Sequence, residues 1–99
     1  MKARIKNSNG VTSVKILAQH IMESGQRKDK DGKLIPAHFI QDLTAKYKGE
    51  TIFVANLGPA VSKDPYISFS FNGGSPGESV DLSWVDNKGE KVNTTAPIK

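Results

Sequence analysis

Side chains able to do chemistry gather in one stretch of the chain, residues 20–40, which reads HIMESGQRKDKDGKLIPAHFI. It holds both histidines of the sequence, His20 and His38, together with Met22. Two imidazoles form a metal site when the segments carrying them pair, but a lone histidine near a strand end is more often a hydrogen-bonded structural residue. We therefore predict no metal at this stretch, and we expect Met22 to pack at the base of a loop.

A calcium loop is the next chemistry to test, because Asp29, Asp31 and Gly32 follow the pattern D-x-D-G. A calcium loop needs carboxylates at its first and last ligand positions. The register set by Gly32 places Arg27 at the first position and His38 at the last. Neither is a carboxylate, so the sequence excludes this calcium site.

Hydrolytic catalysis has no better support in the sequence. There is no cysteine and no Gly-x-Ser-x-Gly motif, so neither a thiol nucleophile nor a hydrolase elbow is available. Neither histidine has an evident carboxylate partner by spacing. Asp29 and Asp31 stand among lysines in a turn, where we expect them to be solvated and ionised. We predict no catalytic residue, no cofactor and no enzymatic activity.

The formal net charge of +4 is compatible with an anionic partner, and equally with a soluble protein that has lysine-rich edges. Residues 26–33 carry four cations, but two aspartates interrupt them and no aromatic residue is interleaved for base stacking. No helix is predicted that could enter a major groove. We therefore expect no nucleic-acid partner, and no apolar run is long enough to cross a membrane.

Alternating apolar and polar residues predict an all-β protein with no helix. The expected strands are residues 3–6, 12–20, 39–47, 51–57, 67–71, 80–84 and 90–97. The continuous apolar run of 51–57 suggests burial on both faces, and the polar strand 90–97 should lie at an edge. About seven strands with Trp84 in a central one indicate an immunoglobulin-like antiparallel β-sandwich as a single domain over 1–99, with a small closed barrel as the rival.

The connection between the second and third predicted strands is long, at residues 20–37. Connections of this length in compact domains are usually functional or disordered. Asp31-Gly32 predicts a type I′ turn, and Ile21, Met22, Leu34 and Ile35 are apolar anchors that argue for order. The connection is therefore predicted to be an ordered, protruding, charged hairpin that contacts a partner.

The same stretch carries a family resemblance. The segments are His20–Asp29, Gly32, Ile35-Pro36, His38–Ile40, Pro59–Ser62, Asp64–Tyr66, Trp84–Asp86 and Gly89. Together they resemble the SoxZ family of sulfur-oxidation subunits over nearly the whole chain. Ile21 and Ser24 stand where that pattern has a proline and a threonine.

The resemblance implies a non-catalytic subunit of a heterodimer with SoxY, a similar small sandwich. SoxY ends in a flexible Gly-Gly-Cys-Gly-Gly arm whose cysteine carries sulfur intermediates of thiosulfate oxidation to successive periplasmic Sox enzymes. It also implies a periplasmic location without a signal peptide of its own, through export with the partner, which fits an N-terminus lacking an apolar segment. The alternatives are a stand-alone β-sandwich adhesion or scaffold module, and a carrier subunit of another periplasmic oxidoreductase.

The resemblance and the loop together predict a set of residues that contact the partner or its arm. They are His20, Met22, Glu23, Arg27, Lys28, Asp29, Lys30, Lys33, Pro36 and Phe39. The four cations of this set would steer an anionic sulfur adduct or dock an acidic enzyme surface, or would only keep the loop soluble. An apolar sheet face or an edge strand is expected to form the heterodimer interface.

Overall fold

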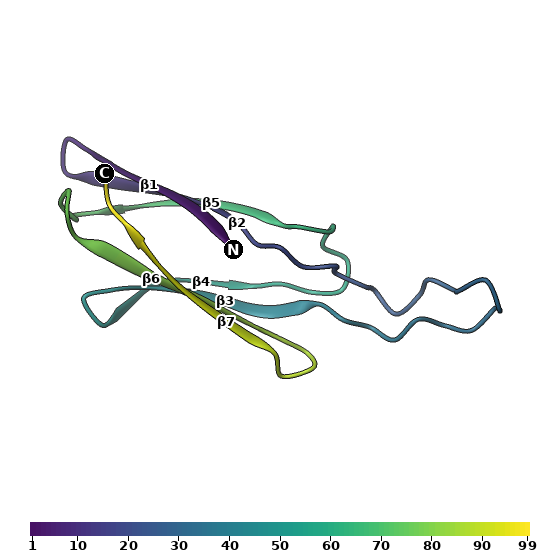
Figure 1. Ribbon diagram of the computed structural model, residues 1–99. Helices are drawn as coiled ribbons and strands as arrows, with labels where there is room; N and C mark the ends of the chain where they lie inside the picture. The colour runs from purple at the N-terminus through teal and green to yellow at the C-terminus, as the bar shows by residue number, and fades with distance from the viewer.

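The computed structural model describes all residues 1–99 and is all-β, as predicted. Its seven strands form two antiparallel sheets that pack as a sandwich, not as a closed barrel (Figure 1). The strands are β1 (Lys2–Ser8), β2 (Val11–Leu17), β3 (Ile40–Tyr47), β4 (Glu50–Asn56), β5 (Tyr66–Asn72), β6 (Ser79–Asp86) and β7 (Lys91–Pro97). Each of the seven predicted strands corresponds to one of these. The structure contains no helix that could span a membrane.

One sheet has the order β1-β2-β5 and the other has the order β4-β3-β6-β7. Polar and apolar residues alternate along the strands, so each sheet turns one face to the core and the other to solvent. Strand β7 lies at an edge, as its polar sequence predicted. The chain then returns to β1, where Asn7 N–H donates to the Lys99 carbonyl and Lys99 N–H donates to the Ile5 carbonyl.

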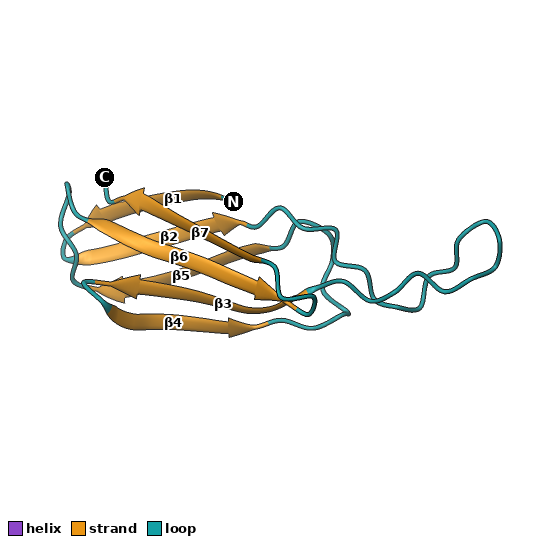
Figure 2. Cartoon of the chain, turned by 60° about the horizontal axis from the view of Figure 1, so that its bottom comes forward, coloured by secondary structure: helices purple, strands orange, loops and turns teal.

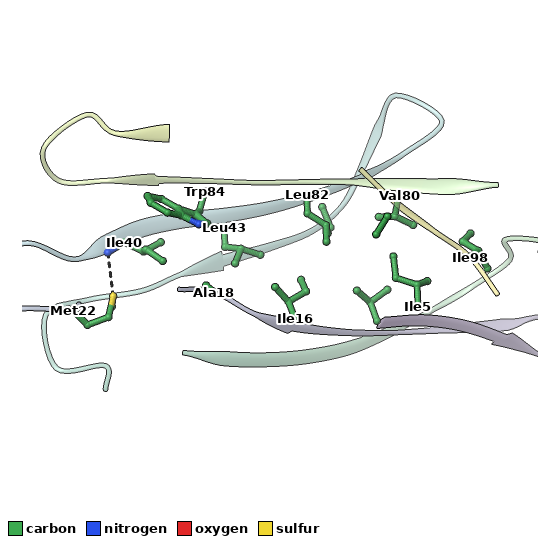
Figure 3. Close-up of a cluster of buried hydrophobic side chains, with 13 residues drawn as sticks. Ile5, Ile16, Ala18, Met22, Ile40, Leu43, Val80, Leu82, Trp84 and Ile98 are labelled. Atoms are coloured by element: carbon green, nitrogen blue, oxygen red, sulfur yellow. Dashed lines mark hydrogen bonds between the residues drawn. The ribbon is translucent and has the colours of Figure 1, made fainter. Parts of the chain in front are cut away.

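The core lies between the two sheets (Figure 3). Val14 and Ile16 of the smaller sheet face Leu43, Leu82 and other apolar residues of the larger sheet, and all four are almost fully buried. Burying a side chain of this size contributes about 1.5–3 kcal/mol relative to leaving it exposed. Trp84 lies in the internal strand β6 and is 6% exposed, as predicted for a core residue.

The prediction that residues 51–57 are buried on both faces is wrong. Strand β4 is an edge strand of the larger sheet, and its Val54 is 51% exposed. A continuous apolar run is compatible with a strand covered on both faces, but it does not exclude an edge strand. The apolar side chains of β4 therefore lie partly on the surface.

The long connection projects from one end of the sandwich as a hairpin (Figure 2), which we call the arm, residues 20–39. It gives the molecule extents of 54 × 20 × 16 Å. Glu23 and His38 exchange two backbone hydrogen bonds, and Ile35 N–H donates to the Arg27 carbonyl nearer the tip. These pairings make the arm an ordered hairpin, as predicted.

The turn at the tip of the arm differs from the predicted type I′ turn. A type I′ turn requires positive φ at both central residues, and here Gly32 has φ +81° while Asp31 does not have a positive φ. Gly32 N–H donates to the Asp29 carbonyl, and Asp29 N–H donates to the Lys33 carbonyl. This pattern is a three-residue loop in which a tight turn is followed by a left-handed glycine.

Candidate functional site: the arm and its anchored base

The base of the arm is fixed by one buried carboxylate, Asp86 at the end of β6. His20 Nε2 lies 3.1 Å and His38 Nε2 lies 2.7 Å from the same oxygen, Asp86 Oδ2. The two histidines belong to the outgoing and the returning limbs of the arm, so the carboxylate ties both limbs to the sandwich. The Asp86 side chain is completely buried. Sequence analysis found no carboxylate partner for either histidine, and the structure corrects this.

The other oxygen of the same carboxylate organises the turn between β6 and β7. Asp86 Oδ1 accepts backbone hydrogen bonds from Lys88 N–H at 3.0 Å and from Glu90 N–H at 2.9 Å. Burial by itself raises the pKa of the Asp86 carboxyl, but the hydrogen bonds from His20, from backbone N–H groups and from His38 outweigh that effect. The net result is a pKa well below the ordinary aspartate value, so the group is a carboxylate.

Asn87, the next residue, holds the returning limb. Its Oδ1 accepts from Phe39 N–H at 2.8 Å, and its Nδ2 donates to the Ala37 carbonyl at 2.9 Å. Its own backbone N–H donates to the Phe39 carbonyl at 3.0 Å. The buried Asp86 and the exposed Asn87 thus anchor the arm through side chains and backbone.

The two imidazoles at the base also pack as aromatic rings. The His20 ring meets the His38 ring and the Trp84 ring edge to face, at centroid distances of 4.6 and 5.2 Å. Met22 is buried beside them, and its sulfur accepts a contact from Ile40 N–H at 3.4 Å (Figure 3). The prediction that Met22 packs at the loop base is confirmed.

His20, His38 and Asp86 bring three possible metal-ligand atoms within 4.8 Å of one another. The hydrogen bonds oppose a metal at this position. His20 Nδ1 accepts from Met22 N–H at 3.0 Å, which assigns the proton of the neutral ring to Nε2, the atom that faces Asp86. A metal bound at Nε2 would require the proton on Nδ1, where it would meet the Met22 donor. We read the cluster as a structural hydrogen-bond network.

The middle and tip of the arm are charged and exposed. Glu23 and Arg27 form an ion pair, with Arg27 Nε 3.0 Å from Glu23 Oε1. The hydrogen bond from Arg27 lowers the pKa of Glu23, and the hydrogen bond to Glu23 raises the pKa of Arg27. Three further cations of the arm make no ion pair: Lys28, Lys30 and Lys33.

The ten predicted contact residues therefore fall into two groups. His20 and Met22 are buried in the anchor, and Glu23 and Phe39 are half-buried beside it. Asp29 stabilises the tip, because its Oδ1 accepts from Asp31 N–H and Lys33 N–H. The exposed members are Arg27, Lys28, Asp29, Lys30, Lys33 and Pro36. Contact with a partner stays a prediction for the whole set.

Sequence reasoning missed Asp86 and Asn87. Asp86 entered the sequence analysis only as the last residue of the Trp84–Asp86 segment of the family resemblance, and Asn87 was not singled out. Asp86 lies 66 residues from His20 and 48 residues from His38 along the chain. The only available signal was an aspartate at an inward-facing position of a strand, since such a buried charge requires hydrogen-bonding partners from elsewhere.

The fold and this site define a small β-sandwich with a charged arm whose base is hydrogen-bonded to the sandwich. The family model of the sulphur oxidation protein SoxZ matches residues 1–97, and the chain belongs to that family. This membership supports a role in the sulfur oxidation system. A comparison with curated proteins returns no match.

Proposed function

We propose that the chain is the non-catalytic subunit of a SoxYZ-type heterodimer in thiosulfate oxidation. In this role it supports a SoxY-like partner, whose C-terminal Gly-Gly-Cys-Gly-Gly segment presents cysteine-bound sulfur intermediates to periplasmic Sox enzymes. Family membership over residues 1–97 is the observation that carries the proposal. The lack of cysteine in the chain agrees with a partner that supplies the sulfur-bearing thiol.

The charged arm is the part of the molecule best suited to meet the loaded partner or an enzyme. Thiosulfonate and sulfonate adducts are anionic, and Lys28, Lys30 and Lys33 are exposed cations without ion-pair partners. A projecting cationic hairpin raises the encounter rate with an anionic group at low salt. The base of the arm is hydrogen-bonded to Asp86 and Asn87 of the sandwich.

The heterodimer interface is proposed at the side of the sandwich where β4 and β5 form the sheet edges. Phe53 of β4 and Phe69 of β5 stack there with ring centroids 4.1 Å apart, and neither ring is fully buried. Val54, the next residue of β4, is 51% exposed on the outer face of the larger sheet. Interface centres are enriched in aromatic residues, and an unpaired strand edge invites association.

Co-expression with a SoxY-like polypeptide that ends in Gly-Gly-Cys-Gly-Gly tests the heterodimer. We expect a soluble 1:1 complex on size exclusion, and recovery of this chain in the periplasmic fraction only when the partner carries an export signal. Persistent failure to associate would contradict the proposal. That outcome would favour a stand-alone adhesion or scaffold module, or a carrier subunit of a different oxidoreductase.

The role of the arm is tested by charge reversal in the assembled complex. The Lys28→Glu/Lys30→Glu double variant should slow turnover of the loaded complex by about tenfold at low salt, without dissociating it. The matched control is Lys46→Glu/Lys91→Glu, which makes the same charge change on the outer face of the larger sheet. If both variants behave alike, the arm cations serve solubility only.

A further inference from the structure

The outer face of the smaller sheet is basic, although sequence analysis did not single it out. Strands β1 and β2 carry four outward-facing cations: Lys2, Arg4, Lys6 and Lys15. None of the ten acidic residues of the chain lies in β1, β2 or β5. None of these four cations forms an ion pair. The face therefore carries uncompensated positive charge.

The strand register places two of these cations directly opposite each other. Arg4 of β1 pairs with Lys15 of β2 across the antiparallel ladder, and both side chains are exposed. Like charges opposite each other on one face of a sheet destabilise it. The Arg4–Lys15 pair destabilises the fold and has no acidic neighbour to offset it, and such unfavourable arrangements are expected at functional sites.

The outer face of the larger sheet shows that this charge is not a general property of the surface. That face carries two lysines, Lys46 and Lys91, and two aspartates, Asp42 and Asp81. Lys46 stands opposite Asp81 in the ladder, an arrangement of opposite charges. The two sheets thus differ in charge, and only the smaller one has a face of a single sign.

Two adjoining open grooves follow this basic face. The larger, of about 860 Å³, is lined by Arg4, Lys6 and Lys15 together with Ser8 and Ser13 and by residues at the β1 edge. The second shares Arg4 and Lys15 with the first and extends to Tyr66. Serine hydroxyls between the lysines add hydrogen-bond donors suited to carboxylate oxygens.

We propose that this basic face docks an extended acidic segment of another protein. Lys2, Arg4 and Lys6 occupy alternate positions of one strand, so their spacing is about 6.7 Å. An extended chain with acidic residues at alternate positions has the same repeat, and each carboxylate would meet a cation. The surface is distinct from the arm, and it uses the outer face of β5, whereas Phe69 of the proposed heterodimer interface lies on the inner face of that strand. The inference therefore does not rest on the proposed heterodimer.

Other anionic ligands fit the face less well. A small oxyanion spans a few ångströms, whereas the β1 cations alone extend over about 13 Å. Single-stranded nucleic acid requires aromatic stacking platforms, and among the aromatic residues only Tyr66 lies on this face. An extended acidic polypeptide matches the length of the basic face, its positive charge and its serine hydroxyl groups.

The test uses the full chain and a synthetic peptide of alternating Glu and Thr residues. We expect backbone amide NMR shifts confined to β1, β2 and β5, and an affinity that falls as salt increases. Arg4→Glu/Lys15→Glu should weaken binding by about tenfold or more, while Lys46→Glu/Lys91→Glu should change it by less than about twofold. Circular dichroism and melting curves establish that both variants are folded.

Three outcomes would overturn the proposal. One is an equal loss of affinity in both variants, which indicates non-specific charge attraction. Another is tighter binding of oligothymidylate or of phosphatidylglycerol vesicles than of the peptide, which assigns the face to nucleic acid or to lipid. The third is the absence of peptide binding at low salt.

Discussion

At the scale of single residues, the Asp86 carboxylate connects more of the site than any side chain chosen from the sequence. One of its oxygens receives both histidines of the arm, and the other receives two backbone N–H groups of the β6–β7 turn. A buried carboxylate with four hydrogen bonds is stable because each hydrogen bond replaces part of its lost hydration. Its partners are in turn fixed by it.

Replacing Asp86 with asparagine should therefore destabilise the protein. The amide keeps one acceptor oxygen, so donors that meet Nδ2 lose their partner, at a cost of about 3 kcal/mol at pH 7. Urea unfolding measures the change. Asp81→Asn, an exposed aspartate of the same strand, serves as the control and should change stability by less than about 1 kcal/mol. Equal effects at the two positions would contradict the anchoring role.

The same carboxylate predicts a pH dependence. Its pKa in the folded protein is depressed below the unfolded value of about 3.9. Its contribution to stability is therefore present above that value and is lost as the pH falls through it toward the lower folded pKa. The difference in unfolding free energy between wild type and Asp86→Asn should shrink between about pH 5 and pH 3. A constant difference over this range would argue against the depressed pKa.

The histidine tautomer makes a prediction about metals. Because His20 Nδ1 accepts a backbone hydrogen bond, adding Zn²⁺ to the metal-free protein should leave its melting temperature unchanged. Binding at a thousand times the dissociation constant would stabilise the fold by about 4 kcal/mol, which a melting curve resolves easily. Zinc stabilisation that disappears in His38→Ala would restore the metal site that we reject.

At the scale of elements, the strands and the edge position of β7 were predictable, but the edge position of β4 was not. Alternating residues such as Ile67, Phe69 and Phe71 identify a half-buried strand from local pattern alone, and β5 has this form. Strand β4 was assigned to a buried position because an apolar run does not reveal how many neighbours a strand has. The tip turn was also assigned wrongly, since Asp-Gly occurs in more than one turn type.

The arm offers a matched pair of glycine substitutions. Gly25 and Gly32 both have positive φ, so alanine is strained at either position by about 1 kcal/mol. Only at Gly25 would the added Cβ crowd the opposite limb, at 3.1 Å from Ala37 Cβ. Gly25→Ala should increase amide exchange at Glu23 and His38, which pair across the arm, while Gly32→Ala should not. Equal amide exchange in the two variants would show that the two limbs of the arm accommodate the added Cβ without weakening their pairing.

At the scale of the whole molecule, the three surfaces proposed to bind partners lie on different parts of the sandwich. The arm projects from one end of the sandwich (Figures 1 and 2), the half-exposed aromatic side lies along β4 and β5, and the basic face covers β1 and β2. A subunit without a proposed catalytic role needs such separate surfaces if it is to hold one partner while meeting others. Their separation also allows each to be tested without disturbing the rest.

The proposed heterodimer interface is tested by two valine substitutions of the same kind. Val54 on β4 and Val11 on β2 are 51% and 39% exposed, so glutamate should be tolerated in the free subunit at both positions. Val54→Glu should weaken association with the SoxY-like partner by about a hundredfold, because it places a charge in an apolar contact. Val11→Glu should leave association unchanged, and the reverse pattern would move the interface to the smaller sheet.

The sequence by itself determined the all-β class, the approximate strands, the ordered charged arm and the family resemblance that the match to SoxZ confirms. These properties depend on residue alternation, turn residues and a continuous motif, all of which are local. Only the tertiary structure decided that Asp86 holds both histidines, that β4 is an edge and that Arg4 faces Lys15. Each depends on strand order and register, which the packing of the two sheets selects across distances in the chain that no local pattern records.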